Sequence, residues 1–509
     1  MIDISNNYSA LFKKIHENNF FFSQNLSKKK QKEISHFSTP NNVAEYMANR
    51  LVQRTTDNIN NYQILDPGAG TGTLGIIVIL KLIKVYPNAS FCLIAYENDH
   101  IIANLLYKNL ELLSDWLLER SYNFSFEVRT NDYILEDNEL LQNSAFKHEK
   151  DYDLIIANPP YKKVIKSSPY VETMPFIVYG APNKYSFFMA KSVIELKQNA
   201  TMVYIVPRSW MSGKYFEKFR QFILKLGSIT ELHSFDSRNN IFGKSKVLQE
   251  LVIIVFTKKQ SSIIDYYHHE SIDNLGTDSK IRTTNDAVIV GTEKKVYSIT
   301  KQEQLEVIDL FRSFKTKLSD TGLKMHTGLT VCFRNKNNLR NSPDKDNVPI
   351  FYSKNLSSYD VNLNKEVEQY ITIENSGLLQ KNKNYLFIKR FSTKEESRRI
   401  QLAFYNSDKF KKYSMISTDN KLNFVTSENE GLLKGAFIIM ASTKFDEYYR
   451  LLNGNTQVNS SEINEMFFPP KEFIKCLSRK ISISNISNLS QQNIDDIFDH
   501  SIYEWRNRH

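Results

Sequence analysis

The chain has 509 residues, enough for more than one domain, and its apolar share of 41% is ordinary for globular cores. Its three cysteines lie far apart and form no CxxC pair, which argues against a disulfide framework or a structural zinc site, so we predict no bound metal. A formal net charge of +10 fits a polyanionic partner without establishing one, because this excess on a long chain is equally a solubility feature.

The start of the chain lacks the apolar segment of a signal peptide. The longest apolar run, LGIIVILKLI, is too short and too interrupted to cross a bilayer. We therefore expect a cytoplasmic chain without a membrane partner.

Residues 1–34 are polar and include three consecutive lysines, so we expect a helical or loosely ordered arm. From Phe37 to about Phe256, strand-like and helix-like segments alternate, which predicts a mostly parallel sheet with helices on both faces. The predicted strands span residues 62–65, 91–96, 124–129, 154–157, 202–206, 229–235 and 251–256. The helix-like stretches between them span residues 76–85, 101–118, 185–196 and 214–226.

This alternation predicts an α/β, Rossmann-like domain over residues 35–260. Residues 261–300 are polar and irregular, and we expect them to form a linker. Residues 301–509 are rich in Asn, Lys, Ser and Tyr without sustained alternation, which predicts a second domain of mixed α+β structure.

A glycine-rich stretch follows the first predicted strand: DPGAGTGTLG, residues 66–75. Gly68, Gly70 and Gly72 allow a tight turn and a close backbone approach to a ligand, and the helix beginning near Leu74 directs its N-terminus toward that ligand. A strand-to-helix turn without a ligand explains the glycines equally well. The GK[ST] ending of a phosphate-binding P-loop is absent.

Acidic side chains follow the next two predicted strands. Glu97, in AYENDH, lies about thirty residues after Asp66, where nucleoside-binding α/β folds place the acceptor for ribose hydroxyls. Asp132, in RTNDYIL, can accept from an adenine amino group, and Tyr133 can stack on the ring. Singly, each is as well explained by a solvated loop acid or a packing aromatic, but the three in order at strand ends favour a nucleoside pocket.

The stretch IIANPPYKK places Asn158 directly after the fourth predicted strand, which Pro159 and Pro160 end because they lack an N–H. The Asn158 amide oxygen and the following proline carbonyl can both accept from an exocyclic amine, and Tyr161 can stack on a flat base. Two acceptors directed at one NH2 make its nitrogen more nucleophilic, which is electrostatic preorganisation. The alternative is a strand-terminating loop with a packing tyrosine.

NPPY together with DPGAGTG resembles the amino-methylating DNA methyltransferases that use S-adenosylmethionine. FSTPNNVAEYMANRL (residues 37–51) precedes the glycine-rich loop, an order that resembles the gamma class of adenine methyltransferases. Further stretches resemble the PstI/BsuBI-type modification methyltransferases of type II restriction-modification systems: APNKYSFFMA, VPRSWMSGKYFEKFRQFIL, FDSRNNIFGKSKVLQE, KRFSTKEESRRI and YYRLLNGNTQVNSSEIN. The resemblance runs from Phe37 to Pro470 and implies a class I methyltransferase domain followed by a DNA target-recognition domain.

The resemblance also implies roles for individual residues. The methionine end of the cofactor would be contacted by Thr39, Pro40 and Val43 (or Ala44, if the alignment shifts by one), and its methionine moiety lined by Asp66, Gly68 and Gly70. The ribose would be held by Glu97, and the cofactor adenine by Asp132 and Tyr133, the latter standing where Phe is more usual. The target adenine would be held by Asn158, Pro159 and Tyr161, with Phe242 stacking on its other side unless Phe242 is an ordinary core residue.

Basic residues are concentrated late in the chain, where residues 381–421 contain eleven Lys or Arg and four Asp or Glu. Interleaved aromatics and amides suit phosphate and base contacts, and the resemblance to a target-recognition region adds to this. The DNA contacts are therefore expected at Lys389, Arg390, Arg398 and Arg399. The alternative is a solvated surface helix in which Glu395 and Glu396 pair with the last two arginines.

The sequence thus predicts a site-specific DNA methyltransferase that transfers a methyl group from S-adenosylmethionine to the adenine amino group by base flipping. Its partners would be double-stranded DNA and, genetically, a cognate restriction endonuclease, and the enzyme would be a monomer associated with the bacterial nucleoid. A cytosine amine, RNA or a protein glutamine as substrate, and a catalytically silent DNA-binding specificity module, remain alternatives. The resemblance suggests a short site such as CTGCAG, but the sequence does not specify it.

Overall fold

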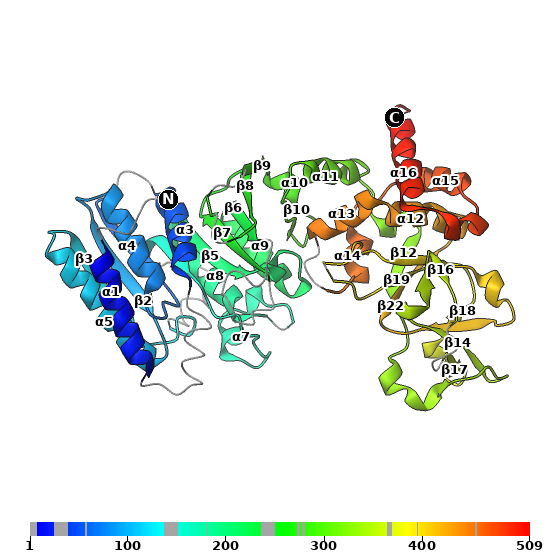
Figure 1. Cartoon of the computed structure of the whole chain (residues 1–509), viewed down its shortest axis with the longest axis horizontal. Helices are drawn as coiled ribbons and strands as arrows, with labels where there is room; N and C mark the ends of the chain where they lie inside the picture. The colour runs from blue at the N-terminus through cyan, green and yellow to red at the C-terminus, as the bar shows by residue number, and fades with distance from the viewer. Residues whose placement is uncertain are drawn as a thin grey trace. The chain divides into compact units, whose positions relative to one another are not determined.

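The computed structural model describes residues 8–24, 39–55, 59–136, 151–180, 182–235, 250–271, 275–276, 280–363, 369–393, 395–452 and 456–508. The chain divides into two compact units, Met1–Thr300 and Lys301–His509. In Figure 1 the first unit runs from blue to green and the second from green to red.

A nine-stranded sheet forms the centre of the first unit, in the order β3-β2-β1-β4-β5-β7-β6-β8-β9 (Figure 1). The first five strands in this order are mutually parallel, and β7 is antiparallel to both of its neighbours. The strands are β1 (Asn61–Asp66), β2 (Ser90–Tyr96), β3 (Asn123–Arg129), β4 (Tyr152–Ala157), β5 (Leu196–Pro207), β6 (Ser228–Phe235), β7 (Leu251–Thr257), β8 (Ile263–His269) and β9 (Lys280–Thr284). The strand order reverses between β1 and β4, the place where open α/β sheets bind ligands.

Helices cover both faces of this sheet. Val203 and Ile205 of β5 belong to a core cluster that also contains side chains of α1, α3, α4 and α5. Tyr204, between them, points to the opposite face, where its hydroxyl lies 2.6 Å from Ser192 Oγ of α8. The helices of this unit are α1 (Ser9–Gln24), α3 (Asn41–Val52), α4 (Thr73–Val85), α5 (His100–Leu118), α7 (Pro169–Thr173), α8 (Lys184–Glu195), α9 (Glu217–Leu226) and α10 (Asn285–Val288).

The predicted Rossmann-like α/β architecture is confirmed, and each of the predicted strands lies within one of β1 to β7. Their apolar runs bury almost completely; all residues of β4, for example, are buried, as expected for a central parallel strand. The described part of the arm is the helix α1, which packs against α5 through Asn18, donating to Asn109 Oδ1 at 2.8 Å. Leu11 and Ile15 of α1 bury into the main core, so this part of the arm is firmly attached.

Residues 261–300 do not form the linker expected from the sequence. They carry β8 and β9, which extend the main sheet. A short hairpin of β10 (Ile289–Val290) and β11 (Lys295–Val296) follows. The sequence IIDYYHH of β8 mixes apolar and polar residues, which concealed the strand. Ile264 and Tyr266 are nevertheless buried, and Asp265 is neutralised by Arg282 of β9 at 2.7 Å.

The second unit is a mixed α+β domain, as predicted. One sheet has the order β12-β22-β19-β20-β16-β15 and the other β13-β17-β14-β21-β18. Their strands are β12 (Leu323–Thr327), β13 (Leu339–Arg340), β14 (Asn347–Phe351), β15 (Leu356–Ser357), β16 (Asp360–Val361), β17 (Tyr370–Thr372), β18 (Gln380–Lys381), β19 (Tyr385–Lys389), β20 (Leu402–Tyr405), β21 (Met415–Thr418) and β22 (Leu422–Ser427). The helices are α11 (Glu303–Ser313), α12 (Gly431–Ala441), α13 (Thr443–Leu452), α14 (Ser460–Glu465), α15 (Lys471–Lys480) and α16 (Gln491–Arg506).

Within the part of the chain that the structure describes, no helix has the length and apolar content needed to span a lipid bilayer. Among the same residues, no group of three or more His, Cys, Asp and Glu side chains is arranged to hold a metal ion.

Candidate functional site

A cavity of about 290 Å³ opens at the carboxyl ends of β1, β2, β3 and β4. Its walls bring together most of the first unit's residues that the sequence singles out. The predicted residues that line it are Thr39, Gly68, Gly70, Glu97, Asp132, Tyr133, Asn158 and Pro159. Parallel strands place the residues that follow them at one edge of a sheet, which explains why segments distant in the chain meet here.

The glycine-rich turn between β1 and α4 forms one wall. Gly72, directly before α4, has a φ of 92°, and a Cβ there would lie 2.8 Å from Leu106 Cδ1, so the fold itself requires this glycine. A Cβ on Gly68 would meet nothing closer than Phe188 Cε1 at 3.6 Å. Gly68 is therefore not demanded by packing, and its missing side chain leaves space in the cavity.

Asp66 lies at the end of β1, fully buried, and is not among the residues that line the cavity. Neither carboxylate oxygen has a hydrogen-bond partner within the described residues. Burial raises the pKa of Asp66 to about 7, although the nearby amides of Gly68 and Gly75 favour the charged form. Asp66 is thus a buried acid directly behind the glycine turn, separated from the cavity surface in this structure.

Glu97 and Asp99 follow β2 and are fixed by the backbone around them. Glu97 Oε1 accepts from the Asp99 amide at 2.9 Å. Asp99 in turn caps α5, accepting from the amides of Ile101 at 3.1 Å and Ile102 at 3.3 Å. Sequence reasoning passed over Asp99, although an Asp directly before a helix is a typical capping signal.

Asp132 follows β3 and is held in its charged form. Burial opposes ionisation, but the Tyr170 hydroxyl at 2.6 Å and the Lys184 ammonium at 3.2 Å hold the pKa of Asp132 below its usual range. Lys184 also lines the cavity and was not predicted. The only hint of it in the sequence was APNKYSFFMA, the stretch that leads into α8.

Tyr133 forms part of the cavity wall with its ring almost wholly covered. Its hydroxyl donates to Glu195 Oε2 at 2.7 Å and lies 3.1 Å from Ser192 Oγ, so the ring is fixed from behind. Phe188 lies beside it, with ring centroids 5.4 Å apart, and also lines the cavity. Sequence reasoning missed Phe188, because a phenylalanine within a helix is usually a core residue.

The Asn158 amide is held at both ends. Its Nδ2 donates to Thr39 Oγ1 at 3.1 Å, and its Oδ1 accepts from the Tyr161 hydroxyl at 2.6 Å. The Tyr161 hydroxyl also lies 3.1 Å from the Ile205 carbonyl oxygen, and burial raises the pKa of Tyr161, which keeps it a donor. Contacts at both ends hold the amide plane of Asn158 in one place at the cavity wall.

Among the described residues, four of those predicted for this region do not line the cavity: Pro40, Val43, Asp66 and Tyr161. Tyr161 packs its ring toward the core and contacts Tyr185 edge-on, 6.3 Å between centroids. Val43 is fully buried, and the Pro40 carbonyl accepts from the Ala44 amide in the first turn of α3. Asp66 was described above. Phe242, the predicted second stacking ring, lies outside the described residues.

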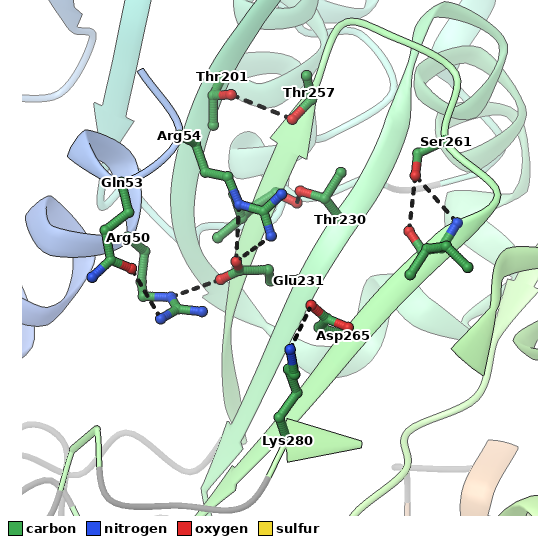
Figure 2. A network of polar contacts seen from close by, with 12 residues as sticks. Arg50, Gln53, Arg54, Thr201, Thr230, Glu231, Thr257, Ser261, Asp265 and Lys280 are labelled. Carbon is green, nitrogen blue, oxygen red and sulfur yellow. Dashed lines mark hydrogen bonds and ion pairs between the residues drawn. The ribbon is translucent and has the colours of Figure 1, made fainter. Parts of the chain in front are cut away.

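The helix α3, which begins two residues after Thr39, is anchored at its far end. Arg50 of α3 donates to Glu231 Oε2 at 2.7 Å, and Arg54, just after the helix, donates to Glu231 Oε1 (Figure 2). Behind Glu231, the Tyr46 hydroxyl lies 2.9 Å from His233 Nδ1. Burial lowers the pKa of His233 to about 4, so this histidine is neutral near pH 7. The end of α3 remote from Thr39 is thus fixed to β6.

The predicted DNA residues of the second unit are mostly engaged within the protein. Arg399 is completely buried: its Nε donates to Ser392 Oγ at 3.0 Å, so it cannot reach DNA from this position and the prediction for it is corrected. Arg398 donates to the Ser442 carbonyl at 3.0 Å and Arg390 to the Asn420 carbonyl at 2.9 Å. Lys389 is partly exposed beside Arg398, along a surface cavity.

The alternative view of this block also fails, because its described residues form turns and bends and not the surface helix it requires. Arg399 is drawn inward by Asp446 of α13, whose Oδ1 accepts from the amides of Arg399 at 2.8 Å and Ile400 at 2.7 Å. The contact between Arg399 and Asp446 could not be predicted from the local sequence, because the two residues are almost fifty positions apart.

Comparisons with known proteins agree with this geometry. Residues 88–242 match the family described as Eco57I restriction-modification methylase. Type II methyltransferase M.BsuBI of Bacillus subtilis is 28% identical over 92% of this chain and 93% of its own length. Type II methyltransferase M.PstI of Providencia stuartii is 26% identical over the same shares of the two chains.

Among solved structures, the type IIL restriction-modification enzyme MmeI in complex with DNA superposes with a TM-score of 0.53 at 13% identity. That match covers 91% of this chain and 72% of the other, and it supports the fold. The chain is therefore homologous, along nearly its whole length, to proteins of restriction-modification systems.

Proposed function

We propose that this chain, a homologue of the type II modification methyltransferases, transfers a methyl group from S-adenosylmethionine to the exocyclic amino group of adenine in a short DNA site. The observation that carries the proposal is the Asn158 amide, clamped between Thr39 and Tyr161 in the same cavity as the glycine turn and Glu97. An oriented acceptor beside a nucleoside-sized cavity suits methylation of an amine.

The residues present fit the cofactor. S-adenosylmethionine supplies an electrophilic methyl group, and its ribose hydroxyls and amino group need acceptors. Glu97 lines the cavity as an acid, and the buried Asp66 beside the glycine turn has both oxygens without a partner among the described residues. Gly68 leaves room that packing does not require. Tyr133 and Phe188 offer flat apolar surface for the adenine of the cofactor.

Asn158 supports the chemistry by binding the amine that is methylated. An amide oxygen has two lone pairs, so Oδ1 can accept from the Tyr161 hydroxyl and still accept from the substrate NH2. The Pro159 carbonyl provides a second acceptor on the same short loop. Since no titrating group is involved, these residues act by orienting the amine nitrogen and stabilising the positive charge that develops on it. The adenine is reached by flipping it out of the duplex.

The relatives M.BsuBI and M.PstI are type II methyltransferases that match this chain over nearly all their length. By this likeness we infer that the chain is the protective half of a type II restriction-modification system, with a cognate endonuclease as its genetic partner. We expect it to act as a monomer in the bacterial cytoplasm, at the nucleoid, with the second unit recognising the DNA site.

Transfer of a labelled methyl group from S-adenosylmethionine to genomic DNA, followed by nucleoside analysis, tests the proposal. We expect the label in N6-methyladenine. Label in N4-methylcytosine would replace adenine by cytosine and leave the active site assignment standing. Label in RNA or protein alone, or no transfer at all, would refute the proposed activity.

A further inference from the structure

We propose that residues 331–340, called here the Phe333 segment, form a contact surface for duplex DNA. Arg334 and Lys336 would bind the phosphate backbone, and Phe333 would pack against bases or sugars in a groove. This inference rests on the proposed function, because duplex DNA is the substrate of that function and the Phe333 segment would be one of the surfaces that bind it.

The Phe333 segment presents unusual side chains to solvent. Its sequence, VCFRNKNNLR, contains three basic residues, three asparagines and no acid. Phe333 is 69% exposed, and the guanidinium carbon of Arg334 lies 5.4 Å from its ring centroid. Arg334, Lys336 and Arg340 are also exposed, and none of them forms an ion pair with another described residue. Phosphates could therefore bind Arg334 and Lys336 without displacing a protein partner, whereas Arg340 already donates to the Asn337 carbonyl at 2.7 Å and the Leu339 carbonyl at 2.8 Å.

The backbone of the segment is fixed, although its side chains are exposed. The amides of Arg334, Asn335 and Asn338 each donate at 3.0 Å to the carbonyl three residues earlier. The Asn335 side chain also donates to the Val331 carbonyl at 3.0 Å. Leu339 anchors the end of the segment in the core of the smaller sheet. A surface of this kind binds with little loss of conformational entropy.

The contrast with the predicted basic block strengthens the inference. Around residues 389–399, the three arginines donate to protein carbonyls or to a buried hydroxyl. Phe391 is 46% exposed and lies 5.9 Å from the guanidinium carbon of Arg390, but that guanidinium is already bound to Asn420. In the Phe333 segment, the guanidinium of Arg334 has no such partner among the described residues.

Charge decides which partner the segment fits. A single exposed phenylalanine is common on protein surfaces and would carry no conclusion alone. Here it stands among cations and amides without an acid, the combination that contacts phosphates, base edges and flat rings together. The acids nearest in sequence, Asp344 and Asp346, lie beyond β13 in the following turn. The chemistry of the segment therefore fits duplex DNA better than a protein surface.

The test measures binding of the full-length protein to a mixed-sequence duplex of about 30 base pairs across a salt series. The double variant Arg334→Ala/Lys336→Ala should weaken binding about tenfold at low salt and reduce the salt slope by about two, one for each phosphate contact. Phe333→Ala should weaken binding about three- to tenfold with an unchanged salt slope, because it removes packing and not charge.

The helix α16 provides a matched control. Tyr503 is 67% exposed, and Arg506 and Arg508 are exposed cations with the same spacing as Arg334 and Lys336. Tyr503→Ala and Arg506→Ala/Arg508→Ala should bind the duplex like the parent. All variants should unfold at the parent's temperature and bind S-adenosylmethionine like the parent, which separates lost contact from lost folding.

Two outcomes would overturn the inference: parent-like affinity and salt slope in both Phe333-segment variants, or an equal loss in the α16 controls, which would reduce the effect to net charge. A methyl-transfer assay on the parent distinguishes this failure from failure of the proposed function. If the parent methylates DNA while the segment variants bind normally, only the segment is refuted. If the parent methylates no DNA, the proposed function is refuted first.

Discussion

The strand-end cavity of the first unit and the basic block of the second unit relate to their sequences in opposite ways. In the cavity, eight of the predicted residues come together, although they are drawn from segments between Thr39 and Pro159. In the basic block, residues that are neighbours in sequence are separated by packing: Lys389 stays partly exposed while Arg399 is completely buried.

The difference lies in what sets each position. A residue directly after a parallel strand is placed by the backbone, because sheet topology brings the carboxyl ends of the strands to one edge. A basic residue in an irregular segment is placed by whichever partner packs against it. Motifs attached to strand ends therefore predict a site, whereas charge density predicts a surface without saying which charges remain on it.

Asn158→Ala tests the strand-end cavity. We expect the methyl-transfer rate to fall by about 10²- to 10³-fold, roughly 2.7–4 kcal/mol, because a preorganised polar contact to the reacting group is lost. Binding of S-adenosylmethionine, measured by calorimetry, should change little. Asn123→Ala, an exposed asparagine at the opposite end of the strands, is the control and should keep full activity. Substantial turnover by the Asn158 variant would remove this residue from the mechanism.

Arg399→Ala tests the basic block, at the one predicted DNA residue that is completely buried. Truncating a completely buried, hydrogen-bonded arginine should lower the free energy of unfolding by about 3 kcal/mol. The salt slope of DNA binding by the folded fraction should stay at the parent's value. Chemical denaturation combined with a salt series measures both. A parent-like stability with a reduced salt slope would mean that Arg399 reaches DNA after all.

The limits of prediction follow from particular residues. The α/β sheet was predictable because its strands are uninterrupted apolar runs, as in β4, whereas β8 was missed because Asp265 and two histidines break the pattern. Glu97 and Asn158 were predictable from their places after strands. Lys184 and Phe188 were not, because both come from α8, which reaches the cavity only through its packing across β5.

Acid should weaken the contacts of Arg50, Glu231 and His233 that fix the end of α3 to β6. Burial lowers the pKa of His233 to about 4, and despite burial the hydrogen bonds from His233 and Arg50 lower the pKa of Glu231 to about 2. Both groups bind protons more readily when unfolded, so their stabilisation is complete above about pH 6.5 and is lost as pH falls, first through His233 and then through Glu231. For His233, the lowering of the pKa from 6.5 to about 4 corresponds to roughly 3 kcal/mol of stability lost in acid.

Denaturant titrations between pH 7 and pH 4 measure the free energy of unfolding and test whether it falls as the pH falls. His233→Gln should flatten the pH dependence over that interval relative to the parent. A variant as steep as the parent would show that another group governs acid unfolding. The exposed His16 of α1, which forms no ion pair with another described residue, provides the control variant His16→Gln, which should leave the slope unchanged.

Glu97→Ala tests whether Glu97, which follows β2, accepts hydrogen bonds from the ribose hydroxyls of S-adenosylmethionine. Losing a charged acceptor for two hydroxyls should weaken S-adenosylmethionine binding by about 1.5–3 kcal/mol. Calorimetry of the variant beside Glu119→Ala, an exposed glutamate at the end of α5, measures the difference. Equal affinities in the two variants would move the ribose acceptor to another residue, of which Asp99 is the nearest acid in the cavity wall.

Thr39→Val makes the smallest and most discriminating change. The substitution keeps the shape of the side chain and removes the acceptor of Asn158 Nδ2, which lies 3.1 Å away. The amide would then be held by Tyr161 alone, so we expect the rate to fall by about five- to tenfold, near 1 kcal/mol, the usual worth of one neutral hydrogen bond.

Separate measurement of kcat and of the KM for S-adenosylmethionine distinguishes the two roles that Thr39 can have. If its hydroxyl orients Asn158, kcat falls while the KM for S-adenosylmethionine stays near the parent's value, and Thr39→Ser restores the rate. If its hydroxyl instead binds the methionine end of the cofactor, as the sequence resemblance implies, the KM for S-adenosylmethionine rises and kcat is spared. A loss of stability without either change would leave Thr39 only a packing role at the start of α3. Since Thr39 and Asn158 are far apart in the chain, the first result would show that the amide depends on a contact which no strand-end motif reveals.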